Sequence, residues 1–203
     1  MKILSFFLIF FLFIFSVHSQ TLPVRKESSA LEVECLFPLA TENMWRYDIY
    51  LEDKKVGILQ MEVLKDQPEE SKRRKFPKDF FSELPDVATY FVRIIDNYQK
   101  RTVIKEVLKD FRGFLYLMDE SIDKLYPFLK DSLREGDQVG NSVVTSTGSK
   151  TFQGRSLSTI VLKDLDKDIV EEYMSNTGLY YYKKGGMEYK LTAAMVKHCG
   201  LPP

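Results

Sequence analysis

Short apolar runs separated by turn residues recur along this chain from Trp45 to Val196. In the first run, apolar residues at 45, 47, 49 and 51 alternate with mostly polar ones, which is the two-residue period of a half-buried strand. Similar runs cover residues 56–64, 87–96, 99–108, 114–118, 143–147, 157–162, 169–174, 179–182 and 189–196. Most gaps between them are too short for a crossover to a parallel strand, so the pattern predicts antiparallel connections.

The balance of strand-like and helix-like segments predicts a mainly β fold. We expect a curved antiparallel sheet or an incomplete barrel with one or two short helical segments, in a single domain over residues 33–203. The proline-rich, charged stretch 66–86 predicts a long loop with a short helix that begins near Pro77. Residues 122–133 are expected to be irregular, because Pro127 lacks a backbone donor. One of these two segments is expected to cover the concave face.

The N-terminal residues 1–19 have the features of a secretory signal peptide. Lys2 precedes an apolar run over residues 3–17, and small residues follow at the positions that a signal peptidase inspects. The run is shorter than the roughly 20 residues that span a bilayer. The sequence therefore predicts cleavage before Gln20 and a mature protein without a transmembrane span. Such a protein would be periplasmic, exposed on the outer surface or secreted, and its polar residues 20–32 would form a flexible lead-in.

Two cysteines remain after removal of the signal peptide, Cys35 near the start of the mature chain and Cys199 near its end. In an oxidising compartment, two thiols without other partners are expected to form a disulfide. Closing so long a loop stabilises a fold by about 4–5 kcal/mol in the chain-entropy model. The alternative is that both residues are separate buried thiols.

Composition and motif spacing argue against several classes of function. Basic and acidic side chains number 29 each, so a general affinity for nucleic acid is not expected. His198 is the only histidine of the mature chain, which excludes zinc sites built on several histidines. Glycine spacing matches no nucleotide-binding loop, and the alternating Asp164, Asp166 and Asp168 lack the Gly and Glu of a calcium-binding hand. We therefore expect no catalytic residues, no cofactor and no metal site.

One dense basic cluster stands out in the 66–86 stretch. It consists of Lys72, Arg73, Arg74 and Lys75, and in an extracellular loop it could bind a polyanion such as a sulfated polysaccharide, or an acidic host or envelope component. The alternative is an ordinary solvated loop, because acidic residues lie directly upstream and cancel much of the local field.

Aromatic residues are concentrated in two regions. Strand alternation sends Tyr180 and Tyr182 to the same face, while Phe80 and Phe81 belong to the predicted long loop. These four side chains are the candidate ligand-binding residues, on a concave face that would take a lipid or another amphipathic molecule. The alternative is ordinary core packing, since aromatic residues are common in any sheet.

Two short motifs carry a resemblance to a known group of proteins. Residues 37–39 read Phe-Pro-Leu, and residues 43–47 read Asn-Met-Trp-Arg-Tyr. This opening resembles that of a group of small exported bacterial proteins, many of them lipoproteins, and later pieces of the chain follow in the same order. Glu42 departs from the group, where a turn Gly is usual, and Val139 stands in the place of a second Trp. The resemblance implies a β-rich exported domain without known catalysis, similar in outline to periplasmic lipid carriers, and it transfers no site residues.

Together these observations lead to one main expectation and two alternatives. The main expectation is a non-catalytic exported domain that binds an apolar or amphipathic ligand, or a partner in the cell envelope. The first alternative is an interaction protein that binds a polyanion or host component through residues 72–75. The second is a hydrolase, whose histidine-based form would have to use His198.

Overall fold

The computed structural model describes residues 35–68, 87–119, 124–164 and 166–197, all within one compact unit that spans Leu31–Pro203. These residues form strands and turns and include no helix, so the prediction of a mainly β fold is confirmed. Accordingly, no helix of the described part has the length and hydropathy of a membrane span. The signal peptide, the lead-in and the helix expected near Pro77 lie outside the described residues.

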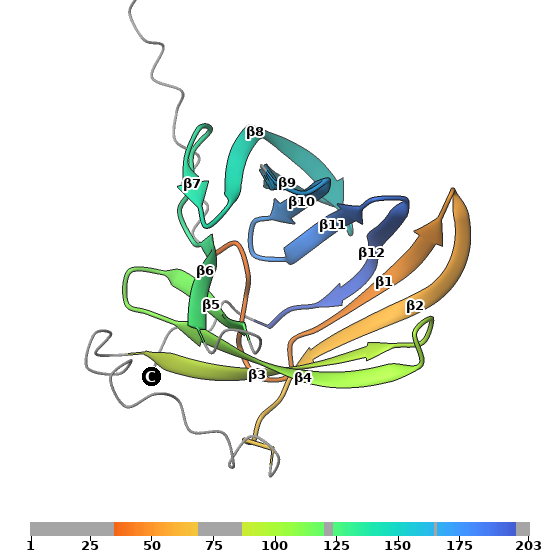
Figure 1. Cartoon of the computed structure of the whole chain (residues 1–203), viewed down its shortest axis with the longest axis horizontal. Coiled ribbons are helices and arrows are strands. Elements are labelled where there is room, and N and C mark those ends of the chain that lie inside the picture. The colour runs from red at the N-terminus through yellow and green to blue at the C-terminus, as the bar shows by residue number, and fades with distance from the viewer. Residues whose placement is uncertain (1–34, 69–86, 120–123, 165, 198–203) are drawn as a thin grey trace, which may run out of the picture. The chain divides into compact units, whose positions relative to one another are not determined.

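Twelve strands form one antiparallel sheet (Figure 1). Their bounds are β1 Met44–Leu51, β2 Lys54–Val63, β3 Ala88–Asp96, β4 Arg101–Lys109, β5 Phe114–Asp119, β6 Lys124–Lys130, β7 Gln138–Val139, β8 Ser142–Phe152, β9 Arg155–Asp164, β10 Ile169–Met174, β11 Gly178–Lys184 and β12 Met187–Met195. The short connection between the first two strands is a hairpin, in line with the predicted antiparallel connections: Leu51 pairs with Lys54, and both turn residues, Glu52 and Asp53, have positive φ angles of 49° and 64°. Two such residues in a two-residue loop match the twist of the strands they join.

The strands follow one another around the sheet in sequence order, with one exception. The order is β6-β5-β4-β3-β2-β1-β12-β11-β10-β9-β8-β7, so the first strand pairs with the last and the break falls in mid-chain. The two ends of this order, β6 and β7, contact each other, and the sheet is a nearly closed barrel (Figure 1). This confirms the expected curved antiparallel architecture. We call the contact between β6 and β7 the seam.

The expectation of an irregular segment around Pro127 is wrong, because this residue lies inside β6. A proline lacks the N–H that a neighbouring strand would use, but β6 has a hydrogen-bonded neighbour on one side only. The register also shifts beside it, where Tyr116 pairs with Pro127. At the seam, a Cβ atom on Gly140 would lie 2.8 Å from the Pro127 carbonyl oxygen, and Gly140 has a φ of +57°. Glycine is therefore required for this close approach.

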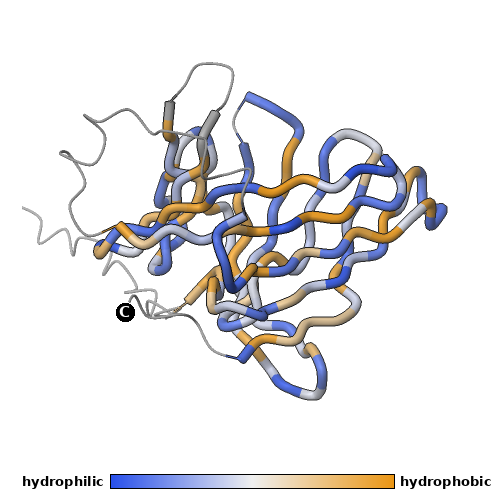
Figure 2. Tube along the Cα trace, turned by 90° about the horizontal axis from the view of Figure 1, so that it is seen from below, coloured by the Kyte–Doolittle hydropathy of each residue, from blue (hydrophilic) through white to orange (hydrophobic). Residues whose placement is uncertain are grey.

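The interior of the barrel is filled by side chains from the strands and by the segment 35–40. Apolar and polar residues alternate along the strands, as expected for a sheet with one buried face (Figure 2). The segment 35–40 is buried throughout and is not part of any strand. We expected the segment around Pro127 or residues 66–86 to cover the concave face; the Pro127 segment is instead a strand of the barrel, and residues 69–86 lie outside the described residues. The largest fully buried side chains are Trp45, Tyr47, Leu36, Leu39, Ile49, Leu108, Leu115, Leu129, Ile160, Leu162 and Met174.

Hydrogen bonds from the surrounding turns hold this segment in place. The fully buried Asn43 donates from Nδ2 to the Pro38 carbonyl at 3.2 Å and accepts from the backbone N–H of Lys197 at 2.8 Å. The carbonyl of Cys35 accepts from the backbone N–H of Asn176 at 2.8 Å. These bonds satisfy backbone groups that would otherwise be buried without partners. They also join Lys197, two residues after the end of β12, to the start of the described chain.

Replacing Glu42 by glycine is expected to stabilise the fold by about 0.5–1 kcal/mol. Glu42 has a φ of 68°, a conformation that costs energy for a residue with a Cβ atom, and its backbone N–H bond to Val63 would be kept. The change also removes an exposed ion pair with Lys197, which contributes little. Urea unfolding of Glu42→Gly and Lys197→Gln would separate the two effects. If Glu42→Gly were less stable than Lys197→Gln, the backbone argument would be wrong.

Candidate functional site

A groove of about 290 Å³ lies over strands β12, β1, β2 and β3, and we call it the outer groove. Met44 on β1 and Met195 on β12 pair with each other in the register and are 41% and 50% exposed. Ile95 and Ala193 extend the apolar wall. Exposed methionines that share a groove are able to adapt to apolar groups of different shapes.

The strand period explains why these residues face outward. Met44 and Arg46 alternate with the buried Trp45 and Tyr47, so they belong to the face of β1 opposite to the core. Their cross-strand neighbours on β2 and β12 share this face, which places Glu62 and Gln60 on one side and Met195 and Ala193 on the other. The outer groove is thus built from the solvent-facing positions of the same strands that form the core.

Trp45 also lines the outer groove and is held rigidly in the core. Its indole Nε1 donates to the Thr177 carbonyl, and its ring stacks on Phe37 with centroids 5.3 Å apart. Gly178 lies against the indole: a Cβ atom there would be 3.1 Å from Nε1, and the residue has a φ of +104°. Trp45 is the only tryptophan of the chain and lies directly behind the groove, so we expect its fluorescence to respond to a ligand there.

The charged side chains at the outer groove differ in whether they have a partner of opposite charge. Arg93 donates from Nη2 to Glu62 at 2.6 Å, so these two charges compensate each other. Arg46 also lines the groove and has no carboxylate partner among residues 35–68, 87–119, 124–164 and 166–197. Within the residues that the structure describes, the groove therefore combines an apolar wall with the unpaired positive charge of Arg46.

A second hollow of about 460 Å³ adjoins the outer groove, and we call it the tip hollow. The two share Ala194 and Met195 at the end of β12. Polar residues at the β8–β9 tip and the β10–β11 turn form much of its wall, including Gln153, Arg155 and Asn176. Gln153 has a φ of 49° and donates from Nε2 to the Ala194 carbonyl at 3.3 Å. This bond ties the β8–β9 tip to β12 and so helps to shape the hollow.

The two tyrosines that we proposed as ligand-binding residues have different neighbours. The Tyr180 ring makes an edge-on contact with the Phe152 ring, with centroids 6.0 Å apart. The Lys150 amine lies 5.1 Å from the centroid of the Tyr180 ring. The Tyr182 ring makes an edge-on contact with the Tyr189 ring, with centroids 5.5 Å apart. Neither tyrosine lines the outer groove or the tip hollow. A ligand-binding role for them remains a prediction.

Tyr182 belongs to a row of residues on the core side of the sheet. Cross-strand pairing connects Leu162, Glu171, Tyr182, Tyr189 and Ile49 in that order, and both ends of the row are fully buried. Burial raises the pKa of the Glu171 carboxyl to about 7 and the pKa of Tyr182 to about 12. The hydroxyl of Tyr173 donates to Glu171 at 3.4 Å and partly offsets the effect of burial on that carboxyl. The row is a packed polar and aromatic layer.

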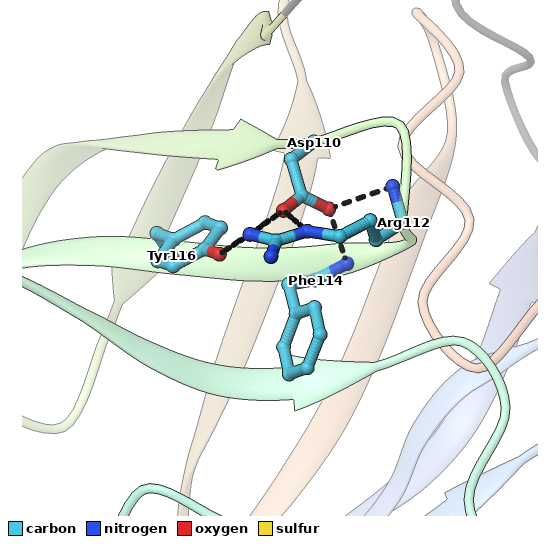
Figure 3. A network of polar contacts seen from close by, with 4 residues as sticks. All are labelled: Asp110, Arg112, Phe114 and Tyr116. Carbon is cyan, nitrogen blue, oxygen red and sulfur yellow. Dashed lines mark hydrogen bonds and ion pairs between the residues drawn. The ribbon is translucent and has the colours of Figure 1, made fainter. Parts of the chain in front are cut away.

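The turn between β4 and β5 contains a fully connected polar network (Figure 3). The buried carboxylate of Asp110 accepts at Oδ1 from the backbone N–H groups of Arg112 and Phe114, and at Oδ2 from the Arg112 guanidinium and the Tyr116 hydroxyl. These bonds measure 2.8–3.1 Å. The hydrogen bond from Arg112 to Asp110 raises the pKa of the guanidinium, which keeps it charged. The network organises the turn and leaves no acceptor of Asp110 open to a ligand.

The alternating aspartates of the β9–β10 connection have a structural role. Asp164 accepts at Oδ1 from the backbone N–H groups of Asp166 and Lys167 at 2.9 and 3.1 Å. Asn141 donates to Asp166 at 3.2 Å. Within the described ranges, no cluster of three or more acidic, histidine or cysteine side chains has the arrangement of a metal site.

Several predicted site residues lie outside the described part of the chain. They are the basic cluster Lys72, Arg73, Arg74 and Lys75, the aromatic pair Phe80 and Phe81, His198 and Cys199. Cys35 is described and is buried next to the core. The disulfide between Cys35 and Cys199 therefore remains a prediction, as does binding of a polyanion or of a ligand at residues 80 and 81.

Neither the outer groove nor the tip hollow was predicted from the sequence. The alternation around Trp45 was sufficient to place Met44 and Arg46 on the solvent-facing side. It gave no sign that Met195 would lie beside Met44, because the pairing of the first and last strands joins segments about 150 residues apart.

No protein-family model and no curated protein sequence matches this chain. Among solved structures, it is similar to a protein of Bacteroides fragilis described as a presumed exported protein with a YmcC-like fold. The two have 9% sequence identity and a TM-score of 0.45, over 80% of this chain and 99% of that one.

Proposed function

We propose that this chain is a non-catalytic, exported β-domain that binds the apolar part of an amphipathic ligand in the outer groove. The observation that carries the proposal is the pair Met44 and Met195, two half-exposed apolar side chains that lie side by side on neighbouring strands in the wall of one groove. Single exposed apolar residues are normal on a protein surface, whereas apolar residues gathered in a hollow are typical of binding sites. The groove volume of about 290 Å³ is close to the lower end of the range for small-molecule sites.

The site differs from the concave face that the sequence led us to expect. Side chains from the segment 35–40 and the strands fill the core side of the sheet. A ligand in the outer groove would need no displacement of core residues. Binding would instead cover Met44 and Met195, and it would change the surroundings of Trp45 without moving its ring.

Export and the disulfide are parts of the same proposal. The backbone N–H of Lys197 donates a hydrogen bond to the Asn43 side chain, which itself donates to the Pro38 carbonyl. The chain after β12 therefore returns to the segment that begins at Cys35. Cys199 follows Lys197 by two residues, a reach of about 7 Å at most. A disulfide needs Cα atoms about 4.4–6.8 Å apart, and the return of the chain to this segment is what supports the proposed pairing. Such a bond requires the oxidising compartment to which a signal peptide would deliver the chain.

Replacing Met44 or Met195 by lysine is expected to weaken binding of a neutral apolar probe, N-phenyl-1-naphthylamine, by about tenfold. Each change removes apolar surface from the outer groove and places a charge there. Probe fluorescence and quenching of Trp45 would measure the affinity. Both methionines are half exposed, so the variants should fold.

Phe111→Lys is the matched control for these two variants. Phe111 is an exposed apolar residue, 70% accessible, and it does not line the outer groove. The Phe111→Lys variant should bind the probe with the same affinity as the unchanged protein. Equal loss of binding in all three variants, or probe binding unaffected by either methionine change, would contradict the proposed site.

A further inference from the structure

We infer that the ligand is an anionic amphiphile, whose apolar chain occupies the outer groove and whose carboxylate or phosphate head lies in the tip hollow near Arg155. This inference rests on the proposed function and adds the chemical class of the ligand and a second binding site. Its basis is the junction of two hollows of different polarity at Ala194 and Met195.

The charges that line the two hollows favour an anion. Among the described residues, the charged ones that line the outer groove are Arg46, Glu62 and Arg93, and the one that lines the tip hollow is Arg155. Glu62 is paired with Arg93 at 2.6 Å, which leaves the guanidinium groups of Arg46 and Arg155 without a described carboxylate beside them. In the described part of the chain, neither Arg46 nor Arg155 has an ion-pair partner. Arginine is well suited to bind a carboxylate or phosphate group through two parallel hydrogen bonds.

The polarity of the walls determines which arginine is the better site for the head. The wall of the outer groove around Arg46 includes Met44, Ala193 and Met195 and suits the hydrocarbon chain. The tip hollow places Arg155 among amide side chains, which can donate further hydrogen bonds to an anion. The hollow measures about 460 Å³, which is enough for a hydrated head group. A ligand that extends across Met195 would thus place its apolar chain on the apolar wall of the outer groove and its negative head beside the positive charge of Arg155.

The test compares decanoate with decan-1-ol, two probes with the same chain length and different head charge. Trp45 fluorescence titrations would give both affinities for the unchanged protein and for Arg155→Gln, Arg46→Gln and Arg134→Gln. Arg134 is exposed and lines neither hollow, so it serves as the matched control. We expect Arg155→Gln to weaken decanoate binding by about fivefold and to leave decanol binding unchanged. Added salt should weaken the binding of decanoate only.

The possible results separate the inference from the proposed function. If decanol and decanoate bind equally well, or if Arg46→Gln weakens decanoate while Arg155→Gln does not, the inference is overturned and the apolar groove stands. If neither probe binds and N-phenyl-1-naphthylamine also fails to bind, the proposed function is overturned. If Arg134→Gln weakened decanoate binding as much as Arg155→Gln does, the preference for decanoate would be a general effect of charge. This result would also overturn the assigned head site. If the head group were phosphate rather than carboxylate, decyl phosphate would bind more tightly than decanoate and show the same dependence on Arg155.

Discussion

Reduction of the mature protein is expected to lower its free energy of unfolding by about 4–5 kcal/mol. The disulfide between Cys35 and Cys199 would close a loop that contains every strand of the barrel, and the stabilisation grows with the length of the loop. Small domains are typically stable by only about 5–15 kcal/mol, so much of the stability would be lost. Urea unfolding followed by Trp45 fluorescence, with and without a reductant, would measure the difference.

Cys199→Ser is the most informative variant for this prediction. It removes the bond and leaves the buried Cys35 side chain in place, so no cavity forms in the core. Its stability should equal that of the reduced protein and should not change with reductant. An intact mass that shows two free thiols in the exported protein, or a Cys199→Ser variant as stable as the oxidised protein, would rule out the bond.

Replacing Asp110 by alanine is expected to destabilise the fold by about 3 kcal/mol. The change leaves two backbone N–H groups, a tyrosine hydroxyl and a guanidinium without their common acceptor (Figure 3). Urea unfolding would measure the loss, and hydrogen exchange at the amides of Arg112 and Phe114 would show whether the turn opens locally.

The double variant Asp110→Ala with Arg112→Ala tests whether these residues act as a unit. Arg112→Ala alone would leave a buried carboxylate without its counter-charge, whereas in the double variant that carboxylate is absent. We expect the double variant to be no less stable than Asp110→Ala alone. Additive losses would show that Asp110 and Arg112 contribute independently. A cost for Asp110→Ala within about 0.5 kcal/mol would show that the network contributes little.

The strands could be predicted from the sequence because each depends on a local pattern. The alternation from Trp45 to Leu51 gave β1 nearly to the residue, and the short gap after it gave the antiparallel connection to β2. Pro127 was misinterpreted because its effect depends on whether a strand lies at the edge of the sheet, which no local pattern reveals. Residues 35–40 could not be assigned to the core for a different reason, because their sequence has neither a helical nor a strand period.

The candidate site was harder to predict than the fold. Aromatic density directed attention to Tyr180 and Tyr182, and aromatic residues serve in packed cores as often as in pockets. The outer groove depends on Met195 meeting Met44, a contact between the two ends of the chain. Interactions of this range are set by the topology of the whole sheet, and a single sequence contains no direct signal for them.

The pairing of β1 with β12 also affects the order in which the barrel can be completed. Each half of the barrel is a meander of neighbouring strands that can pair as soon as they are available, whereas β1 keeps one edge unpaired until the last strand arrives. A chain that crosses a narrow export channel from its N-terminus would therefore remain open until residue 195 has emerged. Until then, the edge of β1 that will pair with β12 would expose backbone N–H and C=O groups without partners, which is where an incomplete barrel is most open to pairing with a strand of another chain.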